Sequence, residues 1–101
     1  MSMDMPAGRS VVRPEQRLTL DQTEGFRRQM LDAVARGEGC VTLDLRALDL
    51  LDSAGVAVVV QCHQTLKERG GRLTVLTDHD GIERVFKVLR LDEHFEVVRA
   101  A

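Results

Sequence analysis

The fold is decided by the stretch VTLDLRALDLLDSAGV, residues 41 to 56. Its first part, together with Cys40, is a short apolar run that ends at Asp44-Leu45 and predicts a buried β-strand. A loop follows, and Asp-Ser-Ala-Gly at residues 52 to 55 then begins a long segment without proline. A buried strand, a loop and a helix start in this order are typical of α/β proteins with a mainly parallel sheet.

The segment after Ser53 requires a choice between strand and helix. Val56 to Val60 is a β-branched run with strand propensity, whereas Gln61 to Arg69 is helix-forming. A helix that begins at Asp52-Ser53 and ends at Gly70-Gly71 separates apolar from polar residues, so we predict a helix. Its apolar stripe consists of Val56, Val59, Val60, His63 and Leu66, and its outward face of Gln61, Gln64, Lys67 and Glu68.

Towards the N-terminus, the sequence predicts an interrupted strand near a sheet edge. The segment from Ser10 to Leu20 alternates weakly, and Pro14 removes one donor from any strand ladder. Residues 1 to 9 lack apolar periodicity, and we expect a flexible tail there.

A first helix is predicted from about Gln22 to Arg36. Asp21 and Glu24 have the spacing of a capping box, and apolar residues recur every four positions after them. Gly37 can take the left-handed conformation that ends a helix.

Towards the C-terminus, the composition and length of Arg72 to Leu76 predict another strand. Asp78 or Asp80 can cap a following helix, and Phe95 to Val98 adds a last short strand. The apolar side of that helix carries Ile82, Val85, Phe86 and Leu89. We therefore predict one α/β domain over residues 10 to 101, with a mainly parallel sheet of four to five strands and three to four helices.

Composition excludes several classes of function. A chain of 101 residues supports one hydrophobic core, and a net charge of -2 with three Phe and no Tyr or Trp argues against nucleic-acid binding. The sequence has neither a signal-like start nor an apolar run of membrane-spanning length, so we expect a cytoplasmic protein that does not insert into a membrane. Cys40 and Cys62 are expected to be reduced, buried thiols.

Catalytic interpretations of the motif are poorly supported. A serine hydrolase would need glycine two positions before Ser53, where the chain has Leu51. Asp44 and Asp52 lack an accompanying cofactor motif, so strand-end and capping roles are expected for them. We therefore predict no enzymatic activity.

No metal or cofactor site is predicted either. His63, His79 and His94 are scattered in the sequence, and Cys62 points about 100° away from His63 on a helix, which does not suit one metal ion. Gly37 and Gly39 precede a strand and lack the third glycine of a dinucleotide-binding fingerprint.

The chain resembles the STAS family, the domain shared by sulfate transporters and anti-sigma-factor antagonists. Asp44-Leu45 and the tetrapeptide Asp52 to Gly55 match its signature, which is an apolar strand ending in Asp-Leu, a short loop and Asp-Ser-Ser/Ala-Gly. Glu68 to Gly71 and Gly81 to Leu91 follow the family's usual order and spacing. The resemblance covers roughly residues 10 to 98 and implies a single-domain STAS-like fold.

The resemblance also implies a function. In antagonists of this family the matching serine is phosphorylated by a partner anti-sigma factor serine kinase, and only the unmodified form binds that partner. Ser53 would be this residue, and a serine phosphatase would be a further partner. The contact surface is expected to comprise Thr19, Asp21, Leu50, Asp52, Ser53, Ala54, Gly55 and Val56.

Two other interpretations remain open for the same residues. Ser53 can be a plain N-cap of the helix, without any regulatory role. The chain can also be an accessory STAS subunit of a lipid or anion transport ATPase, or of a larger signalling complex, without serine phosphorylation.

The sequence departs from the family at the turn before the first helix. The family usually has Gly-x-Leu-Asp there, where this chain has Gln16 to Thr19, so Thr19 replaces an aspartate. The first strand also looks shortened, and an unprotected edge favours pairing with a second copy in a weak homodimer.

Overall fold

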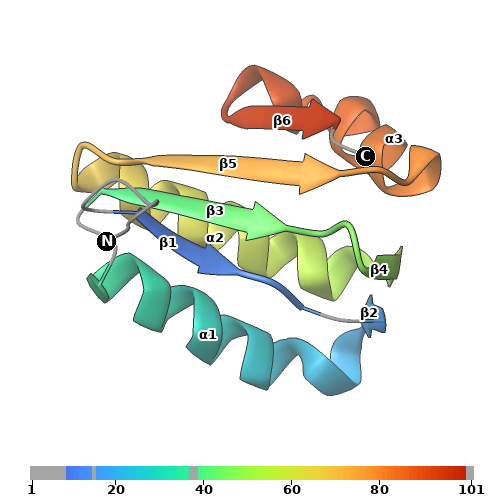
Figure 1. Cartoon of the computed structure of the whole chain (residues 1–101), viewed down its shortest axis with the longest axis horizontal. Helices are drawn as coiled ribbons and strands as arrows, with labels where there is room; N and C mark the ends of the chain where they lie inside the picture. Colours follow the sequence, from blue (N-terminus) through green and yellow to red (C-terminus); the bar gives the residue numbers. More distant parts are fainter. Residues whose placement is uncertain (1–8, 15, 37–38, 100–101) are drawn as a thin grey trace, which may run out of the picture.

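Four parallel strands form the main sheet, in the order β1-β3-β5-β6 (Figure 1). The computed structural model describes residues 9–14, 16–36 and 39–99. In chain order the elements are β1 (Arg9–Val12), β2 (Gln16–Leu18), the 3-10 helix η1 (Leu20–Gln22), α1 (Thr23–Arg36), β3 (Cys40–Asp44), β4 (Leu48–Leu51), α2 (Ser53–Glu68), β5 (Arg72–Thr77), α3 (Asp80–Val88), the 3-10 helix η2 (Leu91–Glu93) and β6 (Glu96–Arg99).

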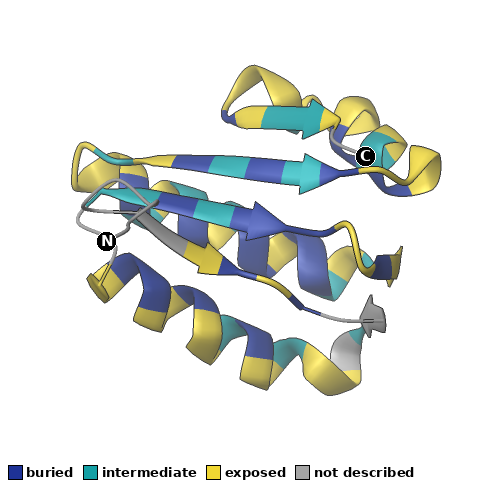
Figure 2. Ribbon diagram, in the orientation of Figure 1, coloured by how far each residue is buried: buried dark blue, intermediate teal, exposed yellow. Residues whose placement is uncertain are grey.

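Burial alternates along the strands because helices cover one face of the sheet. Leu43 and Val75 are register partners in β3 and β5, and both are fully buried. Their neighbours Thr42 and Thr74, which point to the opposite face, are only half-buried (Figure 2). Helix α1 packs on β1 and β3, α2 packs on β5, and the two helices pack on each other. The predicted α/β architecture with a mainly parallel sheet is confirmed.

One strand of a second, smaller sheet occupies the segment between Leu45 and Asp52, for which a loop was predicted. Strands β2 and β4 pair in parallel outside the main sheet, with an irregularity in register between Gln16 and Arg17. In β4 the outer residues are buried and the two central ones are exposed, so the strand lacks the alternation that sequence analysis relies on.

The first strand is interrupted, as predicted. Strand β1 lies at the edge of the main sheet, and β2 follows after a break that contains Arg13 and Pro14. Arg9, which was assigned to the flexible tail, begins β1, whereas residues 1 to 8 lie outside the described part of the chain.

Helix α1 is confirmed, but its predicted capping box is two residues too late. The Thr19 N–H donates to the side-chain oxygen of Gln22 (3.2 Å), and the Thr23 hydroxyl donates to the Thr19 carbonyl (3.1 Å). The 3-10 turn η1 precedes α1, so these capping contacts start at Thr19 rather than at Asp21.

Helix α2 begins and ends where the sequence predicts. Gly70 has a φ of 74°, the left-handed conformation that glycine favours after a helix. Gly71 passes so close to Gly39 that a Cβ there would collide with the Gly39 carbonyl oxygen.

Helix α3 differs from its prediction in two details. His79 is the N-cap, and its Nδ1 accepts from the Gly81 N–H (3.1 Å). Neither Asp78 nor Asp80 takes this role, and Asp80 forms an ion pair with Arg99 instead. Leu89, predicted on the apolar side, is 52% exposed and lies just after Val88, the last residue of the helix.

The two cysteines lie in different surroundings. Cys62 is buried as predicted, and burial raises the pKa of its thiol to about 11. Cys40 is only half-buried, because it occupies the first position of β3. Both thiols are free. Within the described residues, no helix is long and apolar enough to cross a membrane.

Candidate functional site

Helix α2 starts at the end of the molecule where the parallel strands finish. The carboxyl ends of the main-sheet strands and the N-termini of α1, α2 and α3 meet there, on the right of Figure 1. In open α/β sheets this end is the usual place for binding sites. Ser53, the first residue of α2, follows β4 with only Asp52 between them.

Asp52 caps helix α2. Its backbone is extended, its side-chain Oδ1 accepts from the Gly55 N–H (3.1 Å), and its carbonyl accepts from the Val56 N–H (3.0 Å). The capping role expected for Asp52 is therefore confirmed. The alternative in which Ser53 is the N-cap is wrong, because Ser53 already lies inside the helix.

The Ser53 side chain is available at this surface. Ser53 is exposed, and its hydroxyl makes no hydrogen bond within the described residues. A hydroxyl at the first helical position lies next to backbone N–H groups that have no partner inside the helix. These groups and the helix dipole favour a negative charge at this point.

The residues predicted to surround Ser53 fall into two groups. Leu50 is 45% exposed, and Asp52 and Ala54 are half-buried, so all three reach the surface. Gly55 and Val56 are buried and lie beneath it, because they face the core side of α2.

The loop before α1 lies beside this helix start. Leu18 and Leu51 are register partners in β2 and β4, so Thr19 and Asp52 follow from adjacent strand ends. Thr19 is half-buried and Asp21 is exposed. The structure thus places the segment with Thr19 and Asp21, two residues of the expected contact surface, next to the start of α2.

The buried carboxylate of Asp44 and two arginines form a cluster that holds the turn leading into β4. Asp44 is 2% exposed, and it forms ion pairs with Arg13 Nε (2.9 Å) and Arg46 Nη2 (2.8 Å). Its Oδ1 also accepts from the Arg46 Nε (3.0 Å) and from the Arg46 backbone N–H (3.1 Å). The side-chain hydrogen bonds from Arg46 are the largest cause that holds the pKa of Asp44 well below its usual range, and burial opposes them. The strand-end role expected for Asp44 is confirmed.

Neither arginine partner of Asp44 was predicted from the sequence. Arg46 lies two residues after Asp44 and closes a local turn, a signal that the sequence Asp-Leu-Arg contains. Arg13 lies 31 residues away and reaches Asp44 only through the pairing of β1 with β3. The cluster borders a shallow cleft of about 350 Å³, which Ala47 and Asp78 also line.

Two of the three histidines lie side by side near the C-terminal end of α2. His63 and His94, which are far apart in the sequence, lie close together in the structure, with 6.4 Å between their ring centroids. No group of three or more potential metal ligands occurs in the part of the chain that the structure describes.

A four-stranded parallel sheet with helices on one face, and a capped helix that presents a serine at its first position, define a small single-domain α/β protein of the STAS type. The family model described as "Mlab, STAS domain" matches residues 1–99. The chain belongs to the STAS domain family.

Solved structures of two proteins illustrate the shared fold. The Thermotoga maritima protein TM1081, a candidate anti-sigma factor antagonist, matches with a TM-score of 0.84 and 18% identity over 97% of this chain and 84% of its own. The unphosphorylated form of the anti-sigma factor antagonist SpoIIAA matches with a TM-score of 0.78 and 22% identity over 99% of this chain and 87% of its own. SpoIIAA from Bacillus has also been solved in its phosphorylated form.

A transport-related protein shares the same fold. The sulfate transporter family protein from Wolinella succinogenes matches with a TM-score of 0.75 and 14% identity over 90% of this chain and 74% of its own. No curated protein sequence matches the chain.

Proposed function

We propose that this chain is an anti-sigma-factor antagonist, a protein-binding switch controlled by phosphorylation of Ser53. In its unmodified form it binds and sequesters an anti-sigma factor that is also a serine kinase. Phosphorylation by that kinase releases the partner, and a serine phosphatase resets the switch. The chain itself catalyses no step.

One observation carries the proposal: the Ser53 hydroxyl is exposed at the first position of α2, while Asp52 performs the capping. Phosphorylation would therefore leave the cap in place. The free N–H groups of the first helical turn favour the added charge, so the domain can stay folded in both states. A switch of this kind needs two folded forms that differ in their surface.

The surface around Ser53 explains how phosphate would oppose binding. Leu50 supplies exposed apolar area, and Asp52 and Asp21 already supply negative charge. A phosphate adds about -1.5 to -2 charges beside them. A penalty of about 3 kcal/mol from repulsion and desolvation weakens binding more than a hundredfold.

The likeness to SpoIIAA supports the proposal at the level of the fold. SpoIIAA is named as an anti-sigma factor antagonist, and it exists in unphosphorylated and phosphorylated forms. The antagonist function of this chain rests on the Ser53 surface together with this likeness.

The direct test is phosphorylation. The protein is incubated with ATP and the candidate serine kinase, and the peptide that contains residues 52 to 55 is examined by mass spectrometry. We expect a single phosphate on Ser53 and none in the Ser53→Ala variant. An unmodified peptide after prolonged incubation with a kinase that binds the chain would overturn the proposal.

Binding measurements with three variants test the switch itself. Ser53→Ala should bind the kinase with unchanged affinity, whereas Ser53→Asp should bind at least tenfold more weakly. Gln64→Glu is the matched control, because it adds the same charge at an exposed position of α2 away from the helix start. Equal affinity of Ser53→Asp and Gln64→Glu would contradict the switch.

A second candidate function is an accessory STAS subunit of a lipid or anion transport ATPase, without phosphorylation of Ser53. Its support is at the level of the fold, which the chain shares with the sulfate transporter family protein from Wolinella succinogenes. In this case the same surface binds its partner constitutively, and the chain copurifies with a transport ATPase whether or not ATP and a kinase are present.

A further inference from the structure

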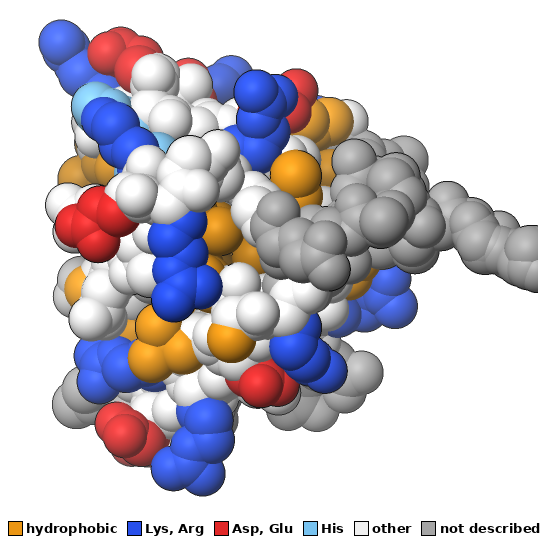
Figure 3. Space-filling view, turned by 90° about the vertical axis from the view of Figure 1, so that its left-hand side faces the viewer, with side chains coloured by type: hydrophobic (Ala, Val, Ile, Leu, Met, Phe, Trp, Pro, Cys, Tyr) orange, Lys and Arg blue, Asp and Glu red, His pale blue; other side chains and the backbone are white. Residues whose placement is uncertain are grey.

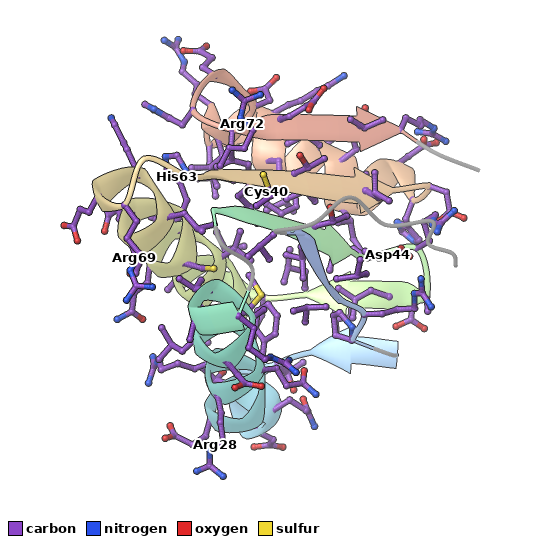
Figure 4. The ribbon with its side chains drawn as sticks, turned by 60° about the vertical axis from the view of Figure 1, so that its left-hand side comes forward. Arg28, Cys40, Asp44, His63, Arg69 and Arg72 are labelled. Carbon is purple, nitrogen blue, oxygen red and sulfur yellow. The ribbon has the colours of Figure 1, made fainter. Side chains whose placement is uncertain are left out.

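A second cleft lies at the opposite end of the molecule from Ser53. It has a volume of about 320 Å³, and we call it the His63 cleft. The charged and aromatic residues in its lining are His63, Lys67, Arg72, His94, Phe95 and Glu96. They come from the second half of α2, the start of β5 and the segment from η2 into β6. Figure 4 shows His63 and Arg72 together at this end, with Asp44 at the other end of the sheet.

Positive charge dominates the lining of this cleft. Lys67 and Arg72 are exposed, and neither forms an ion pair with any described residue. Glu96 is the one acidic residue among those that line the cleft. Figure 3 views the molecule from this end and shows Lys and Arg side chains on its surface, with histidine beside them at the upper left. The cleft therefore lacks a counter-charge for at least one of its cations.

Stabilisation of the end of α2 by a positive charge explains only one of the two cations. Lys67 lies in the last turn of α2, where a cation is favourable because of the helix dipole. Arg72, however, is the first residue of a strand, and His63 lies more than one turn before the helix end. Helix-end stabilisation therefore does not account for the charge of Arg72 or for the position of the His63 ring.

The aromatic side chains fix the shape of the cleft. The His63 ring lies 5.1 Å from the Phe95 ring and 6.4 Å from the His94 ring, and Phe95 contacts the core residue Phe86 edge-on at 6.0 Å. The Nδ1 atom of His63 is buried without a partner, so Nε2 is the ring nitrogen that a ligand can reach. The result is an aromatic wall beside two exposed cations.

We propose that the His63 cleft binds a small organic phosphate, whose phosphoryl oxygens lie against Lys67 and Arg72 and whose organic part contacts the His63 and Phe95 rings. A phosphomonoester carries about -1.5 to -2 charges at neutral pH, which matches two cations better than a single carboxylate does. The guanidinium fork of Arg72 suits two phosphoryl oxygens at once. A volume near 320 Å³ is at the lower end of small-ligand sites.

The site is independent of the proposed switch, because it lies at the other end of α2. Ligand binding there can be measured without any kinase. A Ser53 variant should bind the ligand as the unmodified chain does, so the two proposals fail or succeed separately.

The test is a titration of the full chain, labelled with ¹⁵N, followed by NMR at constant ionic strength. Phenyl phosphate is the main probe, inorganic phosphate tests the free ion, and sodium chloride is the blank. We expect saturable shifts at the end of α2, the start of β5 and residues 94 to 96. Phenyl phosphate should bind more tightly than inorganic phosphate, because only the ester can contact the rings.

Two variants and one control assign the binding to the cleft. Lys67→Gln and Arg72→Gln should each weaken phenyl phosphate binding at least about tenfold. Arg28→Gln removes an exposed cation of α1 outside the cleft and should leave the affinity unchanged (Figure 4). Circular dichroism of each variant shows whether the fold is intact, and Lys67→Gln is decisive if Arg72→Gln disturbs β5.

Three outcomes would overturn the inference. Shifts that do not saturate, or that equal those in chloride, would show that the cleft holds no phosphate. An equal loss of affinity in Arg28→Gln would show general charge screening instead of a site. Equal affinities for phenyl phosphate and inorganic phosphate would exclude the ring contacts and hence an organic ligand.

Discussion

The backbone of Leu18 is the register partner of Leu51 across the parallel strands β2 and β4. Both strands end at this pair, so the chain leaves them side by side, at Thr19 on one strand and at Asp52 on the other. Helices α1 and α2, which follow, pack against each other. This short pairing thus joins the start of α1 to the Ser53 surface and sets which residues can act together there.

The Asp52 cap should contribute measurably to stability. Asp52→Ala removes the acceptor of the Gly55 N–H and should lower the free energy of unfolding by about 1 kcal/mol. Asp52→Asn keeps an acceptor oxygen and should lose clearly less. Urea denaturation followed by circular dichroism measures both. If Asp52→Ala were as stable as the unmodified chain, another group would have to cap α2.

Charge at Ser53 should affect stability in the direction that the helix dipole sets. Ser53→Asp places a negative charge in the first turn of α2 and should change the free energy of unfolding by less than about 1 kcal/mol, whereas Ser53→Lys should be the less stable of the two. The difference should shrink in high salt because the position is exposed. Unfolding of Ser53→Asp would rule out two folded states of the switch.

The main sheet and α2 could be predicted because each depends on local pattern. The β-strand composition of Cys40 to Asp44 and of Arg72 to Thr77 is clear from the sequence. Helical spacing settles α2 although Val56 to Val60 favours a strand, since the buried side chains follow one helix face. The position of Ser53 at a helix start follows from the same spacing.

Other features depend on contacts that local sequence does not specify. Strand β4 is recognisable only through its partner β2, which has three residues. The capping contacts begin at Thr19 because a 3-10 turn is inserted before α1, and His79 caps α3 through a ring nitrogen that standard cap rules omit. Arg13 meets Asp44 only once β1 and β3 have paired.

The Asp44 cluster should stabilise the turn between β3 and β4. Asp44→Asn removes the charge that Arg13 and Arg46 share and should lower the free energy of unfolding by about 1–2 kcal/mol at pH 7, a modest figure because Arg13 is 61% exposed. Arg13→Gln, which leaves Arg46 in place, should cost less. Urea denaturation gives both values. If Arg13→Gln lost as much stability as Asp44→Asn, the ion pair with Arg46 could not be the dominant one.

The pH dependence of the same cluster follows from its lowered pKa. Asp44 is ionised in the folded chain at pH values where the unfolded chain, with the usual pKa of 3.8, already binds a proton. Its stabilising effect is therefore complete above about pH 5 and is lost as the pH falls below 4. The stability difference between the unmodified chain and Asp44→Asn should shrink from pH 6 to pH 3. A constant difference would show that charge has no part in it.

His63 should make the fold less stable in mildly acidic solution. Burial is the largest cause that lowers its pKa, and Lys67 and His94, which face it from α2 and from the end of η2, lower it further. Arg72 and Glu96 also line its cleft, with opposite charges. Because the folded pKa lies below the usual 6.5, the unfolded chain binds the proton first, and stability present above that value is lost as the pH falls.

The variant His63→Gln isolates this effect. Between pH 7.5 and pH 5.5 the free energy of unfolding of the unmodified chain should fall more steeply than that of His63→Gln. His79, whose ring caps α3, and His94 are the same residues in both proteins. Asp44 does not interfere, because it stays ionised throughout this range in both states. Parallel stability curves for the two proteins would mean that His63 binds its proton equally well in the folded and the unfolded chain.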